Sequence, residues 1–185
     1  FKAKIIVIHH PTAIVPGYTP VMHAHIVLFF FKQKTAYEIS AWLEFRRVLF
    51  RSAYLAKFLL GKRYKVFGGY RRLSTPNFWR LYNLGINDKV ELLPLDVLDS
   101  RSISEALISS APSEVYHLAA QSFVGASFVQ PLYTSDVTGF GSVRLLDEIL
   151  KFNKKIKFYQ ASSSEMFVED NSPIKNETST FKPVS

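Results

Sequence analysis

The sequence predicts an α/β protein with a doubly wound parallel sheet, and three observations support this fold class. From Ala53 onward, helical and strand patterns alternate as α-β-α-β-α-β-α-β. Two strand patterns, residues 114–122 (EVYHLAAQS) and 156–165 (IKFYQASSSE), each end in small and hydrogen-bonding residues. A length of 185 residues with 48% hydrophobic content suffices for one domain with a core. Alternating helices and strands require a parallel sheet covered on both faces.

The elements follow from local patterns. Tyr54, Leu55, Phe58 and Leu59 share one helix face, and Gly61 is placed to end that helix. The later elements are expected, in order, as a strand at 64–69, a short helix at 77–84, a strand at 90–95, a helix at 103–109 capped by Asp99 or Ser100, a strand beginning at Glu114, a long helix at about 133–152 and a strand at 156–161.

This alternation lacks its first strand. The most strand-like run upstream of Ala53 is residues 24–31, an almost continuous apolar stretch. Since the sheet has a vacancy, we predict that residues 24–31 take the place of the central strand.

Residues 1–52 do not continue the alternation of helices and strands that begins at Ala53. Residues 4–8 and 21–27 are predicted as strands joined by a proline-bearing loop. His23 and His25 would share a strand face, but no carboxylate or cysteine joins them, so we predict ordinary strand histidines and no metal site. Residues 37–50 mix aromatics and arginines without a clean helical or strand period. A basic aromatic surface for nucleic acid or membrane is the functional alternative for this stretch.

Charge and composition limit the partners. The net charge of +8 divides into a surplus of five over residues 1–52 (seven Lys/Arg, two Glu) and three over residues 53–185 (sixteen and thirteen). We therefore expect no nucleic-acid binding by residues 53–185. The longest unbroken apolar run, residues 26–31, is far too short to span a bilayer. The absence of cysteine suits a reducing cytoplasm, where we expect the protein to reside.

Polar residues follow the predicted strands at the edge where such sheets bind dinucleotides. Arg71, Arg72 and Ser74 suit the 2′-phosphate of NADP, because guanidinium groups match phosphate oxygens, although a surface basic pair explains them equally well. Asp96 either accepts from an adenine amine or caps a loop.

Beyond the last strand, Ser163 and Glu165 are the candidate catalytic groups. A hydroxyl can hydrogen-bond a reacting sugar oxygen while a nearby carboxylate moves a proton. The same SSSE pattern is also typical of a helix cap, and the residues alone leave both interpretations open.

Residues 53–185 resemble the GDP-mannose 4,6-dehydratases of the extended short-chain dehydrogenase/reductase group. The resemblance rests on AYLAKFLL, GGYRRLSTPNFWRL, LLPLDVLD, EVYHLAAQSFVGASF and IKFYQASSSEMF. It implies a partial Rossmann domain that holds NADP. The implied cofactor-binding residues are Arg71, Arg72 and Ser74 near the 2′-phosphate, Asp96 and Val97 at the adenine, and Leu118, Ala119, Ala120, Gln121, Ser122 and Tyr133 along the nicotinamide half.

The resemblance also implies a reaction. GDP-mannose would be oxidised at C4 of the hexose, water would be eliminated across C5 and C6, and the hydride would return to C6. Ser163 stands where the family usually has threonine, and Glu165 falls on the carboxylate that handles the C5 proton. Full-length members are expected to be homo-oligomers. Another NADP-dependent nucleotide-sugar epimerase or reductase is the alternative, which the NFWRL loop and the Ser-x-Glu pair disfavour.

Departures from the family pattern lead us to expect an inactive internal fragment. Arg51 and Ser52 stand where the glycine-rich phosphate turn should precede Ala53, and no glycine elsewhere supplies a strand-turn-helix cradle. The printed sequence ends before the family's Tyr-x-x-x-Lys pair, and Val168 replaces an expected glycine.

The segments before Ala53 carry different resemblances. Residues 1–27, through HHPTAIVPGYTPVMHAH, resemble part of the C-terminal β-barrel of the elongation factors that carry aminoacyl-tRNA. A non-enzymatic RNA- or ribosome-associated module is therefore a further alternative. Residues 28–52, with FFFKQKTAYEI and EFRRVLFRS, look like translated sequencing-adapter read-through, a non-native linker. On this interpretation, deleting residues 1–52 should leave the α/β portion largely intact.

Overall fold

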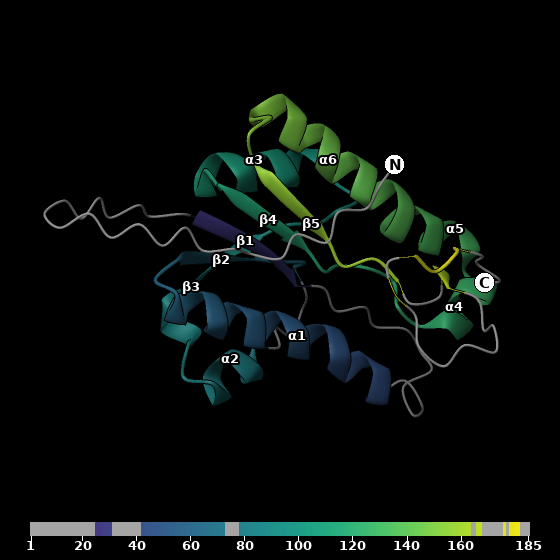
Figure 1. The fold of residues 1–185 in the computed structure, drawn as a ribbon, viewed down its shortest axis with the longest axis horizontal. Helices are drawn as coiled ribbons and strands as arrows, with labels where there is room; N and C mark the ends of the chain where they lie inside the picture. Colours follow the sequence, from purple (N-terminus) through teal and green to yellow (C-terminus); the bar gives the residue numbers. More distant parts are fainter. Residues whose placement is uncertain are drawn as a thin grey trace, which may run out of the picture.

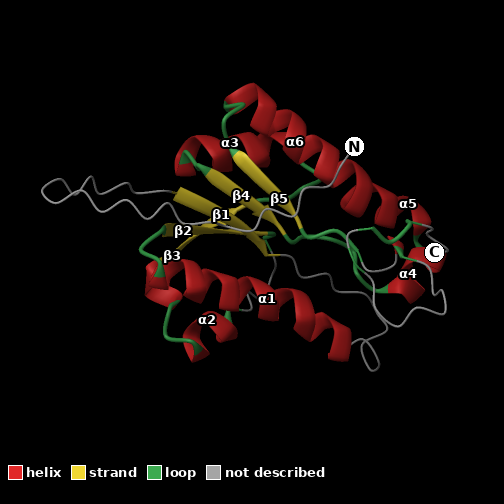
Figure 2. Ribbon diagram, in the orientation of Figure 1, coloured by secondary structure: helices red, strands yellow, loops and turns green. Residues whose placement is uncertain are grey.

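The structure is a computed structural model that describes residues 25–30, 42–72, 78–163, 166–167, 176 and 178–181 (Figure 1). Its centre is a five-stranded sheet with helices on both faces. Figure 2 shows α1 (Trp42–Gly61) and α2 (Trp79–Asn83) on one side of the sheet, and α3 (Ser100–Ser110) and α6 (Gly141–Phe152) on the other. The predicted α/β class is confirmed.

All strand pairings in the described sheet are parallel, and the strand order is β3-β2-β1-β4-β5. The strands are β1 (His25–Phe30), β2 (Lys65–Tyr70), β3 (Val90–Pro94), β4 (Glu114–His117) and β5 (Lys157–Gln160). Consecutive strands run outward in one direction from β1 to β3 and then in the other from β4 to β5. The order reverses between β1 and β4, which is the topological switch point of a doubly wound sheet.

The prediction that residues 24–31 take the vacant central position is confirmed by β1. This strand pairs with β2 from His25 opposite Lys65 to Phe30 opposite Tyr70. On its other edge it pairs with β4, and Val27 lies opposite Val115. Deleting residues 1–52 would therefore remove the strand that joins the two halves of the sheet. Because β1 holds this central position, we now expect the deletion to destabilise the α/β portion, contrary to the expectation from the sequence.

Helix α1 crosses the boundary expected at Ala53. It begins at Trp42, although residues 37–50 show no clean helical period in the sequence. The second half of α1 forms because it buries one face. The buried residues on that face are Ser52, Ala53, Ala56 and Leu59. A helix nucleated on such a face extends at little cost, since each further residue adds a backbone hydrogen bond. Gly61 is its last residue, as predicted.

The remaining helices match the expected order. Asp99 caps α3, and its Oδ1 accepts a hydrogen bond from the Arg101 backbone N–H at 3.0 Å. A 3₁₀ turn, η1 (Asn87–Lys89), precedes β3. The predicted long helix at 133–152 is built from α5 (Pro131–Thr134), the π-helical segment η2 (Ser135–Phe140) and α6, and it follows the short α4 (Val124–Val129). No helix in the described ranges is long and apolar enough to cross a membrane.

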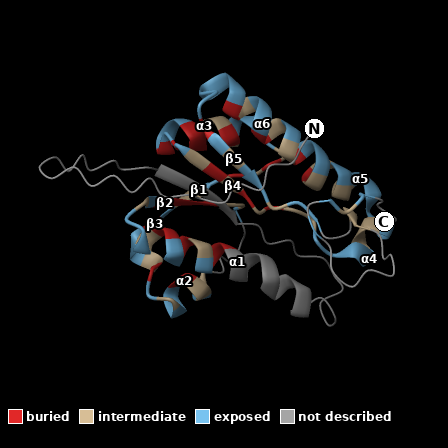
Figure 3. Ribbon diagram, viewed as in Figure 1, coloured by how far each residue is buried: buried red, intermediate tan, exposed pale blue. Residues whose placement is uncertain are grey.

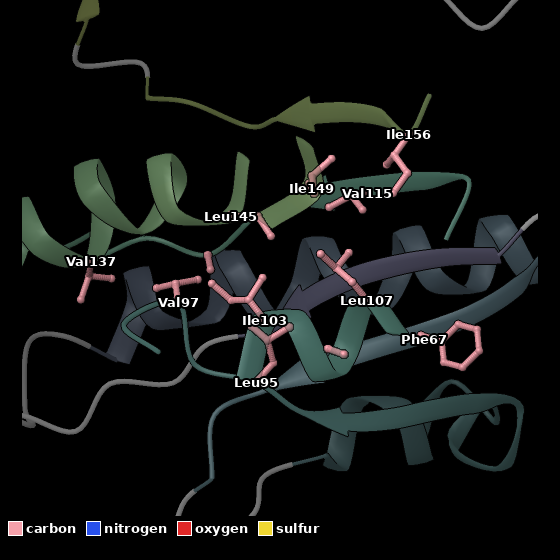
Figure 4. Close-up of a cluster of buried hydrophobic side chains, with 12 residues drawn as sticks. Phe67, Leu95, Val97, Ile103, Leu107, Val115, Val137, Leu145, Ile149 and Ile156 are labelled. Carbon is pink, nitrogen blue, oxygen red and sulfur yellow. The ribbon is translucent and has the colours of Figure 1, made fainter. Parts of the chain in front are cut away.

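Buried side chains form one cluster on each face of the sheet. Figure 3 colours buried residues red, and they occur on the helices of both layers. Figure 4 shows the larger cluster, which lies between the sheet and helices α3 and α6 and includes Phe67, Ile103, Val115 and Leu145. The smaller cluster lies under α1 and α2 and includes Leu59, Val66 and Leu81. Because both faces are covered, β2 and β4 present apolar side chains to both layers.

Gly141 sets how closely α6 approaches the loop after β3. A Cβ at this position would lie 2.9 Å from Cγ2 of Val97 and 3.1 Å from its Cβ. Val97 is itself fully buried, so it has little room to move aside. In contrast, a Cβ at Gly139, two residues earlier in η2, would meet nothing within 4 Å.

We expect Gly141→Ala to lower the free energy of unfolding by about 1–3 kcal/mol through overpacking. The matched control, Gly139→Ala, should be neutral or stabilise the protein by up to about 1 kcal/mol, because alanine favours helices. Urea unfolding followed by circular dichroism measures both. The Gly141→Ala penalty should shrink in a Val97→Ala background. Equal effects of the two glycine substitutions would contradict the contact.

Candidate cofactor and active site

The predicted site residues gather at one edge of the sheet because they follow the carboxyl ends of parallel strands. Arg71 and Arg72 follow β2, Asp96 and Val97 follow β3, and Ser163 follows β5. This edge faces α4 and α5 in Figure 1. Ser74 and Glu165 lie outside the described residues, so their predicted roles stay predictions.

The segment after β4 is tied to the neighbouring helices through Gln121. The backbone N–H of Gln121 donates to Oγ1 of Thr138 at 3.1 Å. Its side-chain Nε2 donates to the Phe123 carbonyl at 3.0 Å and to Oγ1 of Thr134 at 3.3 Å, while its Oε1 accepts from the Phe123 N–H at 2.6 Å. Both ends of the amide thus hold the loop, which gives Gln121 a structural role that the sequence did not indicate.

The other residues of this segment differ in what they can offer a ligand. Ala119 is buried in the core, so its side chain packs and only its backbone faces the edge. Leu118 and Ala120 are half-buried, and Ser122 is exposed. Small residues at this place let a ligand approach the backbone of the strand end.

Two of the predicted cofactor residues contact each other directly. Nη1 of Arg71 donates a hydrogen bond to the Tyr133 hydroxyl at 3.1 Å, and the pair is partly buried. The two residues are 62 positions apart in the sequence, one after β2 and the other on α5. Arg72 is exposed beside them. The structure therefore brings Arg71 and Tyr133 together, whereas the resemblance assigned them to opposite halves of the cofactor.

The turn after β3 is ordered by its own side chains. Oδ1 of Asp96 accepts from the Leu98 N–H at 3.0 Å, and the Ser102 hydroxyl lies 3.0 Å from both the backbone nitrogen and the carbonyl oxygen of Asp96. Asp96 thus acts as a loop cap, one of its two predicted roles. The side chain of Val97 is fully buried against Gly141, so Val97 could meet an adenine only through its backbone.

Ser163 is exposed at the carboxyl end of β5. The preceding residue, Ser162, has a left-handed backbone with φ of 56°, which is uncommon for a residue other than glycine. The hydroxyl of Ser162 lies 2.9 Å from Sδ of Met166. The left-handed residue turns the chain sharply between the strand and Ser163, and such backbone conformations often occur near functional sites.

His117, which the sequence did not single out, is the last residue of β4 and is fully buried. Its Nε2 lies 3.1 Å from the Ser142 hydroxyl on α6, and its ring lies against that of Phe158. Burial lowers the pKa of His117 from 6.5 to about 4, since the charged imidazolium loses its hydration. The strand alternation with Val115 was the available signal, because it places both side chains on one face.

On the opposite face, Tyr116 is held neutral. Its hydroxyl donates to Oε2 of Glu114 at 3.0 Å, and Lys157 binds the other carboxylate oxygen at 3.1 Å. Burial raises the pKa of Tyr116, and the neighbouring Glu114 raises it further. A tyrosine with a raised pKa is a poor proton acceptor at neutral pH, so Tyr116 is not a candidate base.

The buried His117 makes stability depend on pH. Because its folded pKa is lower than the unfolded value of 6.5, its contribution is complete above pH 6.5 and is lost as pH falls toward 4. We expect this one group to cost about 3 kcal/mol across that window. Urea unfolding of the wild type and of His117→Asn at several pH values measures it, and the variant should show a shallower decline. An unchanged slope would contradict the assignment.

Comparison with known proteins identifies the family. A family model described as GDP-mannose 4,6 dehydratase matches residues 50–185 of the chain. The chain belongs to the GDP-mannose 4,6-dehydratase family. Named GDP-mannose 4,6-dehydratases from Vibrio cholerae and Homo sapiens are 40% and 38% identical to it over 140 and 141 residues. Each alignment covers 72% of this chain and 38% of the relative, so the match spans well under half of their length.

Solved structures support the fold. UDP-glucose 4-epimerase from Brucella ovis, solved in complex with NAD, superposes with a TM-score of 0.66 at 19% identity and covers 87% of this chain and 42% of that one. The UDP-Glc/GlcNAc 4-epimerase from Campylobacter jejuni gives 0.68 at 16% identity, with 87% and 44% covered. At these identities, the likeness concerns the arrangement of strands and helices. It agrees with a Rossmann-type sheet, in which ligands bind at the carboxyl ends of the strands.

The residues at this edge fit one end of a nicotinamide dinucleotide better than its middle. The guanidinium groups of Arg71 and Arg72 suit a phosphorylated ribose, and the small residues after β4 leave room near the backbone. Arg51 and Ser52, which the sequence placed at the position of the phosphate turn, lie inside α1. The connection between β1 and α1 is instead residues 31–41, which read FKQKTAYEISA and contain no glycine. It lies outside the described residues, and its composition does not match a glycine-rich phosphate turn.

Proposed function

We propose that the chain is the nucleotide-binding part of a GDP-mannose 4,6-dehydratase that uses NADP and works in the cytoplasm. The whole protein would convert GDP-mannose to GDP-4-dehydro-6-deoxy-mannose and water. The observation that carries the proposal is the family match over residues 50–185, with the predicted residues collected at the ligand-binding edge of the sheet. Arg71 and Arg72 at the end of β2 support NADP over NAD, since guanidinium groups bind a 2′-phosphate.

The proposed chemistry uses two side chains beyond β5. A nicotinamide dinucleotide, when bound, supplies the site that accepts and later returns a hydride. The Ser163 hydroxyl would donate a hydrogen bond to the C4 oxygen of the hexose and hold it during oxidation. Glu165 would remove the C5 proton once the C4 carbonyl has made it acidic. The carboxylic acid formed would pass that proton to the C6 hydroxyl, which leaves as water when the C6–O bond breaks. The exposure of Ser163 at the strand end supports access of a sugar.

The 185-residue chain itself is expected not to turn over GDP-mannose. Residues 31–41, which connect β1 to α1 in the sequence, contain no glycine, whereas Rossmann-type sheets use a glycine-rich turn after the first strand to bind a pyrophosphate. Without that close approach, a dinucleotide would be held mainly by its adenosine end. A test of catalysis therefore needs a complete phosphate turn.

The sharpest test grafts residues 53–185 into the Vibrio cholerae GDP-mannose 4,6-dehydratase in place of its matching segment. The hybrid should convert GDP-mannose with loss of one water, which mass spectrometry detects. Ser163→Ala in the hybrid should lower kcat by about 100-fold or more, because the positioned hydrogen bond to the reacting C4 oxygen is lost. Ser163→Thr is the matched control, since it keeps the hydroxyl and should retain most activity.

A hybrid that folds but only interconverts UDP-glucose and its C4 epimer would favour the nucleotide-sugar epimerase alternative. Full activity of Ser163→Ala would remove Ser163 from the proposed mechanism while leaving the family assignment unchanged.

We also propose that residues 1–27 and 28–52 are foreign to the enzyme, the first a piece of an elongation-factor barrel and the second a non-native linker. The start of the family match at residue 50, three residues before Ala53, supports this division. The described pairing of β1 is compatible with a foreign origin, because backbone hydrogen bonding in a sheet does not depend on side-chain identity.

Finally, we propose that full-length members associate through the exposed apolar side chains of α5, η2 and α6. Leu132 on α5 is 85% exposed, and along η2 and α6 Phe140, Val143 and Leu150 are more than half exposed at helical spacing. Leu132→Glu should lower the mass measured by light scattering, whereas Ile108→Glu, at an exposed apolar position on α3, should not. Equal effects of the two substitutions would contradict this surface.

A further inference from the structure

The hydrogen bond between Arg71 and Tyr133 spans the two halves of the sheet. Arg71 is the first residue after β2, which lies on one side of β1. Tyr133 is on α5, which follows β4 on the other side of β1. A bond of 3.1 Å between their side chains therefore connects the β2 end with the region beyond the switch point between β1 and β4. A dinucleotide lies across this crevice in sheets of this order.

The two partners differ in how firmly they are held. The Tyr133 ring packs against the buried cluster between the sheet and α6, which fixes its hydroxyl. The Arg71 side chain reaches the hydroxyl from the end of β2 through a flexible aliphatic stem. A guanidinium that binds the 2′-phosphate of an adenosine is expected near the end of the second strand. Its contact with Tyr133 directs the same group toward the β4 half.

We propose that Tyr133 is a specificity-determining residue that competes with the 2′-phosphate of an adenine nucleotide for the Arg71 guanidinium. The proposal rests on the proposed NADP site. A phosphate is the stronger partner, because the hydrogen bonds it accepts from a guanidinium are charge-assisted and can be bidentate. Each protein molecule with Arg71 on Tyr133 must nevertheless release that bond first, so the apparent affinity is reduced by the fraction in the competent arrangement.

This competition affects only ligands that carry the 2′-phosphate. Removing the Tyr133 hydroxyl frees the guanidinium while leaving the ring in the core. A net hydrogen bond of ordinary strength corresponds to about a two- to tenfold change in an equilibrium constant. Nucleotides without the 2′-phosphate do not need Arg71 and should bind equally well to both forms.

The experiment uses the full 185-residue chain and two small ligands, adenosine 2′,5′-bisphosphate and 5′-AMP, titrated by calorimetry at low salt. Tyr133→Phe should bind the bisphosphate about two- to tenfold more tightly than the wild type, with 5′-AMP changed less than about twofold. The gain should disappear in an Arg71→Met background. Tyr82→Phe, which removes the hydroxyl of an exposed tyrosine on α2, is the matched control and should change neither affinity.

The outcomes separate the competition from the cofactor site itself. Unchanged or weaker binding of the bisphosphate by Tyr133→Phe overturns the competition, as does a gain that persists with Arg71→Met. Both results leave the nucleotide site standing. Failure of every variant to bind either ligand contradicts the proposed nucleotide site, and the competition falls with it. Native circular dichroism spectra of all variants exclude misfolding as the cause.

Discussion

The structure depends on the pairing of β1 with both of its neighbours. In the order β3-β2-β1-β4-β5, no other described strand connects the β2 side to the β4 side. A parallel sheet is stable only when its strands are paired and its faces are covered, since open backbone groups and bare apolar faces are costly. The run HIVLFF contains β-branched and aromatic residues, which favour strands. Through these pairings, β1 sets the positions of the β2 and β4 ends relative to each other.

The geometry of the edge then follows from how α5, η2 and α6 pack against the loops after β3 and β4. Gly141 lets α6 approach the loop after β3 within contact distance of Val97, and Gln121 ties the loop after β4 to α5 and η2. From the sequence alone, the polar side chains of Gln121 and Asp96 resemble ligand contacts. The Gln121 amide and the Asp96 carboxylate both satisfy backbone groups of their own loops. At the proposed nucleotide site, these two side chains would therefore chiefly fix the backbone around the ligand.

The sequence predicted features that depend on local pattern and missed those that depend on contacts between distant segments. Residues 24–31 could be assigned to the central strand because a strand covered on both faces needs a continuous apolar run. Helix α1 before Ser52 could not be predicted, since residues 42–50 show no periodicity and the helix extends from a face buried further along. The Arg71–Tyr133 bond joins residues 62 positions apart, and no spacing rule reaches that far.

The arrangement of charge suggests how nucleotide affinity would be divided at the proposed site. A Rossmann-type site normally holds the pyrophosphate with backbone N–H groups and a helix N-terminus, where a glycine lets the backbone come close. Residues 31–41 contain no glycine, so this contribution is expected to be small, and the Arg71 and Arg72 side chains carry more of the attraction. Attraction between a partly exposed guanidinium and a phosphate is screened by salt more strongly than a buried backbone cradle is. A site that relies on these side chains would be sensitive to any group that hydrogen-bonds the Arg71 guanidinium. The Tyr133 hydroxyl makes such a bond in the structure.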